Sequence, residues 1–151
     1  MTTESELVDY IVMLESGDAK PFSNPSFLEE MRKKCIAVIN DGFSSEAHYL
    51  LGIYHIQKGE NEKARVERLK AAYLGHCVAA MDYASQSDDY DSVEILGIVK
   101  AMNEAGEDLD SAQEDFDYYL SCMSEDKEKA VNKVARAVVA SMKEKGLSFQ
   151  R

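Results

Sequence analysis

The chain has 151 residues, of which 45% are hydrophobic and 30% are charged, a balance typical of one soluble globular domain. Its net charge of −11 disfavours nucleic acid and anionic membranes as partners, because both select for basic surfaces. No apolar run reaches the roughly 18 residues of a membrane span, and the acidic start of the sequence does not resemble a signal peptide. These features predict a cytoplasmic protein that contacts neither nucleic acid nor membrane.

Apolar residues recur at helical spacing from one end of the chain to the other. Leu7, Tyr10 and Leu14 follow the i, i+3, i+7 pattern of an amphipathic helix. Similar stripes predict helices over 7–14, 28–39, 47–54, 66–73, 78–83, 95–102, 112–123 and 131–142. No segment shows the clear period-two alternation of a strand bounded by hairpin residues. The sequence therefore predicts an all-α protein.

Residues that begin and end helices lie between these stripes. Asn24-Pro25 marks the start of the second helix, and Ser26 and Glu29 just after it have the spacing of a capping box. Gly42 is expected as the left-handed C-cap of this helix. Glycines are also expected to end later helices, at Gly59, Gly75, Gly106 and Gly146. The N-caps expected for the last two helices are Asp110 or Ser111, and Ser124.

Helix ends and small residues recur with a period in the low thirties. Intervals of 33, 31 and 40 residues separate Gly42, Gly75, Gly106 and Gly146. Small residues early in the first helix of each pair recur 32 and 33 residues apart, at Ala47, Ala79 and Ala112. Such a period with two helices per unit is typical of helical-repeat arrays. We therefore predict a single domain of four helix pairs, over 3–42, 44–75, 76–106 and 110–146.

One part of the chain resembles a known family. The residues that carry the resemblance are Ala47-His-Tyr-Leu-Leu-Gly52-Ile-Tyr54, Gly59, Ala64, Ala71-Ala-Tyr-Leu-Gly75 and Ala79. They resemble a tetratricopeptide repeat of the Sel1-like subgroup, with the best match over 44–84. His55 stands where that pattern has an aromatic residue, and the Sel1 insertion between the two helices is missing. The resemblance implies a right-handed stack of αα-hairpins, an α-solenoid whose concave face binds a peptide or a partner protein.

The same resemblance implies which residues face that groove. They lie three residues before and one residue after Gly52, and likewise around Ala84 and Asp117, which stand at the equivalent place in the next two repeats: Tyr49, Ile53, Met81, Ser85, Glu114 and Tyr118. The main functional prediction is thus a non-enzymatic protein–protein interaction module. A simpler interpretation makes some of these residues part of the core, above all Ile53 and Met81.

Acidic charge is concentrated in the third quarter of the chain. Residues 71–126 carry a net charge of −13, whereas 1–70 carry −3 and 127–151 carry +5. The candidate acidic surface comprises Asp88, Asp89, Asp91, Asp108, Asp110, Glu114, Asp115 and Asp117. The alternative function is an inhibitor or immunity protein that neutralises a basic toxin or nuclease through residues 82–126. The plainer interpretation is that the basic final helix packs beside the acidic ones.

The sequence contains no recognisable catalytic, phosphate-binding or metal-binding motif, so we expect no enzymatic activity, metal or cofactor. The cysteines lie far apart, at Cys35, Cys77 and Cys122, and are expected to be small buried apolar residues. His48 and His55 are two turns apart, about 10.5 Å along a helix, which is too far for one metal ion. Both, and His76, are expected at the surface or in the groove.

Overall fold

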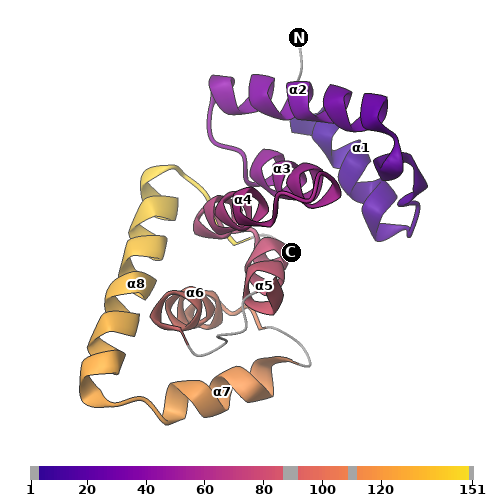
Figure 1. The fold of residues 1–151 in the computed structure, drawn as a ribbon. Helices are drawn as coiled ribbons and strands as arrows, with labels where there is room; N and C mark the ends of the chain where they lie inside the picture. The colour runs from indigo at the N-terminus through magenta and orange to yellow at the C-terminus, as the bar shows by residue number, and fades with distance from the viewer. Residues whose placement is uncertain (1–3, 87–91, 109–111, 150–151) are drawn as a thin grey trace. The chain divides into compact units, whose positions relative to one another are not determined.

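A computed structural model describes residues 4–86, 92–108 and 112–149, without the side chains of residues 85 and 86. No strand occurs in these residues, and the predicted all-α class is confirmed (Figure 1). The elements are α1 (Glu4–Glu15), the 3-10 helix η1 (Lys20–Ser23), α2 (Pro25–Asp41), α3 (Ser45–Gln57), α4 (Asn61–Tyr73), α5 (Cys77–Gln86), α6 (Val93–Glu104), α7 (Gln113–Ser121) and α8 (Glu125–Glu144). The chain divides into two compact units, Met1–Ala71 (unit 1) and Ala72–Arg151 (unit 2).

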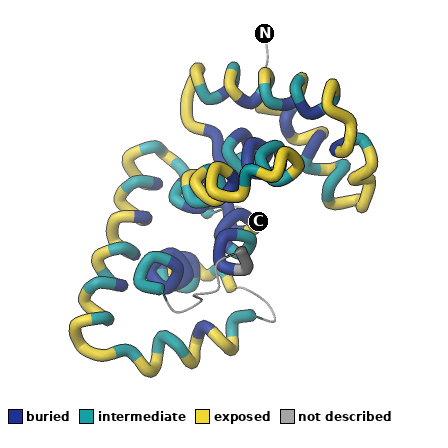
Figure 2. The backbone as a smooth tube through the Cα atoms, viewed as in Figure 1, coloured by how far each residue is buried: buried dark blue, intermediate teal, exposed yellow. Residues whose placement is uncertain are grey.

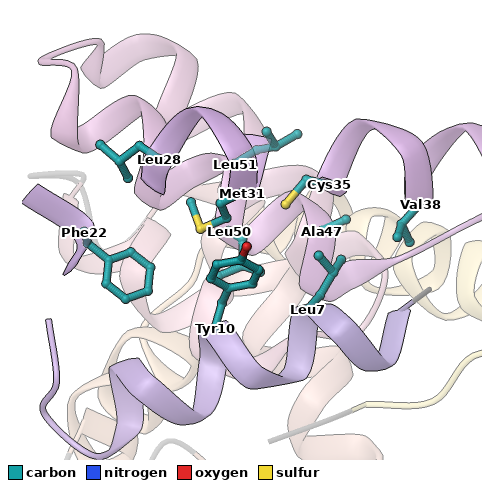
Figure 3. Close-up of a cluster of buried hydrophobic side chains, with 10 residues drawn as sticks. All are labelled: Leu7, Tyr10, Phe22, Leu28, Met31, Cys35, Val38, Ala47, Leu50 and Leu51. Carbon is teal, nitrogen blue, oxygen red and sulfur yellow. The ribbon is translucent and has the colours of Figure 1, made fainter. Parts of the chain in front are cut away.

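The core of unit 1 is shared by α1, η1, α2 and α3. Its cluster of buried side chains (Figure 3) comprises Leu7, Tyr10, Phe22, Leu28, Met31, Cys35, Val38, Ala47, Leu50 and Leu51. The half-buried Phe27 adds edge-to-face contacts, with ring centroids 5.4 Å from Tyr10 and 5.2 Å from Phe22. Because most of these residues belong to the stripes predicted for the first three helices, those stripes do face the core.

The N-cap of helix α2 lies two residues before Ser26, the cap in the predicted capping box. The side chain of Asn24 is the cap: its Oδ1 accepts hydrogen bonds from the backbone N–H of Ser26 at 2.9 Å and of Phe27 at 3.3 Å. The Glu29 carboxylate instead binds Arg32 on the same helix. Proline favours the first helical position, where its missing N–H is not needed. Pro25 therefore makes Asn24 the cap, and the capping box was wrong.

The end of α2 also differs from the prediction. Gly42 has a φ of 163°, which is extended backbone, so it is not the left-handed C-cap that was expected. Its N–H donates to the carbonyl of Ile39 at 3.2 Å, and the chain then runs to Ser44. The Ser44 hydroxyl accepts from the N–H of Ala47 at 3.1 Å and so caps α3. Gly42 and Ser44 are both extended, and this short extended link connects the end of α2 to the start of α3.

Unit 2 is built around α6. This helix is buried nearly all round, through Ile95, Leu96, Gly97, Ile98, Val99, Ala101 and Met102. Helix α8 packs one side against it and buries Val131, Ala135, Val138 and Met142, while its opposite side is exposed (Figure 2). The backbones approach closely at Gly97, where an added Cβ would overlap Val134 and lie 3.1 Å from the carbonyl oxygen of Val131.

Other predicted helix features have mixed outcomes. Ser124 caps α8 as expected, with its hydroxyl accepting from the N–H of Lys127 at 3.2 Å. The expected helix ends at Gly59, Gly75, Gly106 and Gly146 all have positive φ. Val66 and Val78 were expected to face the core, but 51% and 38% of their surfaces are exposed. The buried residues of α4 are instead the alanines Ala64, Ala71 and Ala72. The caps predicted at 110 and 111 lie outside the described residues.

No helix in the described part of the chain is both long enough and apolar enough to cross a membrane.

Candidate functional site

Two of the predicted groove residues share an exposed face of α7. Glu114 and Tyr118 are four residues apart, so they lie one turn apart on the same side of the helix. Tyr118 is 65% exposed, the largest exposed fraction among the described large hydrophobic residues outside the core. Asp117 also lies on this face and accepts a hydrogen bond from Gln113 at 2.8 Å. The opposite side of α7 holds the buried Phe116. We call Glu114, Asp117 and Tyr118 the α7 face.

The other predicted groove residues are less accessible. Tyr49 and Ile53, on α3, are half-buried and pack against the unit 1 core. Met81, on α5 in unit 2, is half-buried as well. Ser85 lies on α5, but its side chain is outside the description. Of the predicted groove residues whose side chains are described, only Glu114 and Tyr118 are exposed, and both lie on α7.

The candidate acidic surface is described only in part. Asp108 is exposed just before α7, and Glu114, Asp115 and Asp117 are exposed in the first half of that helix. Carboxylates in a first helical turn are stabilised by the amide dipoles there. The predicted residues Asp88, Asp89, Asp91 and Asp110 lie outside the described residues. The described acidic surface is therefore centred on α7.

A histidine–carboxylate pair that the sequence did not reveal joins α3 to α4. His48 Nδ1 lies 2.6 Å from Glu67 Oε2, and each side chain is only 15% exposed. Burial by itself raises the pKa of Glu67, but the hydrogen bond and charge of His48, with smaller contributions from Lys70 and His55, outweigh it and leave that pKa below its ordinary value. The pair is thus a polar contact between neighbouring helices. No local spacing could have identified it, since its members are 19 residues apart.

A second histidine, His55, lies near the end of α3. His55 Nδ1 is 3.1 Å from Glu60 Oε1, and Lys63 Nζ is 3.0 Å from the other oxygen of that carboxylate. Hydrogen bonds from His55 and then Lys63 lower the pKa of Glu60. An open hollow of about 320 Å³ lies beside these groups and is lined by His55, Glu62, Lys63, Val66 and Glu67. Its lining is charged and shallow, which suits a surface contact better than an enclosed small-molecule site.

The cysteines divide by exposure. Cys35 and Cys77 are buried as predicted, whereas Cys122, just after α7, is exposed, so the prediction for Cys122 was wrong. Helix α7 ends at Ser121, which leaves Cys122 in the link to α8 rather than on a packed helix face. Burial, with the charge of Glu67, raises the pKa of Cys35 to about 12. The Cys35 thiol is therefore un-ionised at neutral pH and a poor nucleophile.

His76 is buried, contrary to the expected surface position. Only 7% of its surface is exposed, and its Nδ1 accepts a hydrogen bond from the backbone N–H of Ala79 at 3.1 Å. It thereby satisfies an N–H in the first turn of α5, as an N-cap side chain does. Burial lowers the pKa of His76 to about 4, which keeps the ring neutral and able to accept this bond.

Among the described residues, no group of three or more His, Cys, Asp or Glu side chains is arranged to hold a metal ion. Comparisons with protein-family models, with curated proteins and with solved structures found no match to this chain.

Proposed function

We propose that this protein is a non-enzymatic protein–protein interaction module that binds a partner through an exposed helical face. The proposed architecture is a right-handed stack of tetratricopeptide-like hairpins of the Sel1-like subgroup. Two observations support the stack: the residues of 44–84 that resemble this family, and the packing of α3 against both α1 and α2. In such a stack, each first helix contacts both helices of the preceding pair.

The α7 face is the observation that carries the proposed binding role. Tyr118, with 65% of its surface exposed, lies beside acidic neighbours on the short helix α7. Tyrosine is enriched at interfaces because its ring offers a large contact area and its hydroxyl a hydrogen bond. Glu114 and Asp117 beside it supply charges that orient a partner. We propose Tyr118 as the anchor of the contact.

A basic partner is the second candidate, and the exposed carboxylates favour it. Glu114, Asp115 and Asp117 lie within four consecutive residues of α7 and are all exposed. This local field attracts a cationic protein, such as a basic toxin or nuclease that the chain would neutralise. Under this alternative, binding depends on the carboxylates more than on the ring, and it weakens as salt rises.

The experiment compares four variants in affinity capture from the native lysate, with each captured protein quantified. Tyr118→Ala tests the anchor, and Phe43→Ala is its control, since Phe43 is an aromatic residue of unit 1 with 62% exposure. Removing a central aromatic anchor weakens binding by about 1–3 kcal/mol, or roughly tenfold or more. We expect one protein to be lost with Tyr118→Ala and retained with Phe43→Ala.

Charge variants separate the second candidate from the first. Glu114→Gln with Asp115→Asn removes two carboxylates from α7, and Asp9→Asn with Glu15→Gln removes two exposed ones from α1 as a control. Loss of capture at low salt with the α7 variant alone would favour the basic partner. If every captured protein is insensitive to both α7 variants, the proposed site is wrong.

A further inference from the structure

A straight row of basic side chains follows the exposed side of α8. Lys129, Lys133, Arg136 and Lys143 are spaced by four, three and seven residues, which places them on one stripe about 21 Å long. All four are exposed, and the side of α8 that faces α6 holds the buried residues (Figure 2). No acidic residue interrupts the stripe between Lys129 and Lys143. We call these four residues the α8 ridge.

The positive charges of the ridge have few acidic partners among the described residues. Lys129 lies 3.8 Å from Glu125 on the same helix, and Lys133, Arg136 and Lys143 form no ion pair with any described residue. Like charges three or four residues apart destabilise a helix by a few tenths of a kcal/mol per pair. The chain as a whole carries a net charge of −11, yet this row of basic side chains faces solvent. Such a row can bind an acidic surface of a partner.

The α7 face has the complementary pattern. Its carboxylates, on Glu114 and Asp117, are three residues apart, as are Lys133 and Arg136 on the ridge. Tyr118 projects beside them, and a tyrosine ring can stack on an arginine guanidinium. The ridge also carries an apolar neighbour for that ring, Val139, which is 44% exposed. The α8 ridge and the α7 face are therefore complementary both in charge and in apolar contact.

We propose that the α8 ridge binds the α7 face of a second copy of this chain. Copies related by a two-fold axis would form this contact twice, because each supplies one ridge and one α7 face. The net charge of −11 opposes approach at long range, but salt screens charges beyond about 8 Å under physiological conditions. The choice of another copy as the occupant rests on its α7 face, whose exposed carboxylates and tyrosine match the charges and the apolar neighbour of the ridge. The dimer needs no foreign partner, but it covers the α7 face of the proposed function, so a second copy and a foreign partner would compete for that face.

Sedimentation of the full chain with paired charge reversals tests the dimer. The α8 reversal is Lys133→Glu with Arg136→Glu, and the α7 reversal is Glu114→Lys with Asp117→Lys. We expect the wild type to dimerise at about 100 µM in about 0.15 M salt, where the net charge is screened, and each reversal to raise the dimer Kd about tenfold or more. An equal mixture of the two reversed chains should form a mixed dimer of near wild-type affinity, because both contacts are then again between opposite charges.

Controls apply the same charge changes to unit 1. Lys20→Glu with Lys33→Glu matches the α8 reversal, and Asp9→Lys with Glu15→Lys matches the α7 reversal; all four residues are exposed. Neither control should change the dimer Kd more than about twofold. If a reversal lowers the helical circular dichroism signal, Lys133→Gln with Arg136→Gln replaces it and should give a smaller weakening in the same direction.

Two results would overturn the proposal. The first is a wild-type chain that stays monomeric at about 100 µM in about 0.15 M salt. The second is a mixture of the reversed chains that forms no mixed dimer. If the first result is obtained and the monomeric chain binds polyglutamate through the ridge, the ridge is assigned to a foreign acidic protein instead. Because the assay contains only this chain, its failure leaves the proposed partner binding untouched.

Discussion

Replacing Gly97 by alanine tests the close packing of α6 on α8. A Cβ at this position would overlap the Cβ and Cγ1 of Val134 and lie 3.1 Å from the carbonyl oxygen of Val131. The Cβ of Val134 and the carbonyl oxygen of Val131 cannot move without their backbone, so the two helices must move apart. Overpacking of this kind costs about 1–3 kcal/mol, while alanine gains about 1 kcal/mol over glycine in helix propensity. We expect the upper part of that range, because a Cβ cannot rotate away, and hence a net destabilisation of about 1–2 kcal/mol.

Gly52 offers a matched control in α3. An added Cβ there would lie 3.2 Å from Cγ of Arg68, part of a flexible side chain, and 3.6 Å from the Ala64 carbonyl oxygen. Gly52→Ala should therefore be neutral or stabilise the protein by up to about 1 kcal/mol. Thermal unfolding followed by circular dichroism should place the Tm of Gly97→Ala about 2–8 °C below that of the wild type. The Tm of Gly52→Ala should not fall.

A double-mutant cycle with Val134→Ala isolates the contact itself. Val134→Ala removes Cγ1, one of the two overlapping atoms, and keeps the other. The effects of Gly97→Ala and Val134→Ala on the free energy of unfolding should then couple by about 1 kcal/mol or more, with the double variant more stable than their sum predicts. Additivity within about 0.5 kcal/mol, or a Gly97→Ala protein as stable as Gly52→Ala, would refute the argument.

Two further predictions concern a titrating group and a thiol. Because burial lowers the pKa of His76 to about 4, the unfolded chain binds a proton first as pH falls. The free energy of unfolding should thus decrease between about pH 6.5 and pH 4, and urea titrations of His76→Asn should lack that part of the pH dependence while showing no new one. Native protein should react with a thiol reagent rapidly at Cys122 and slowly at Cys35, whose pKa is raised to about 12 by burial. A Cys122→Ser chain that keeps the rapid phase would contradict this assignment.

Most of the helices could be predicted from the sequence alone. A helix places residues three and four apart on one side, so apolar stripes such as Leu28, Met31 and Cys35 mark the buried side without any knowledge of its neighbours. Local hydrogen bonds are equally readable, as with Ser124 at the start of α8. The charge division between the acidic third quarter and the basic last helix was also visible in the sequence.

Tertiary structure decided the features that depend on contacts between helices. Nothing in the neighbouring residues marks Gly97 as the point of closest approach to α8, or pairs His48 with Glu67, 19 residues away. The sequence around His76 gives no sign that its ring is buried and caps α5. The exposure of Tyr118 likewise depends on which side of α7 the packing of Phe116 turns inward. Local periodicity fixes which residues share a helix face, but only the packing of helices on each other determines what that face meets.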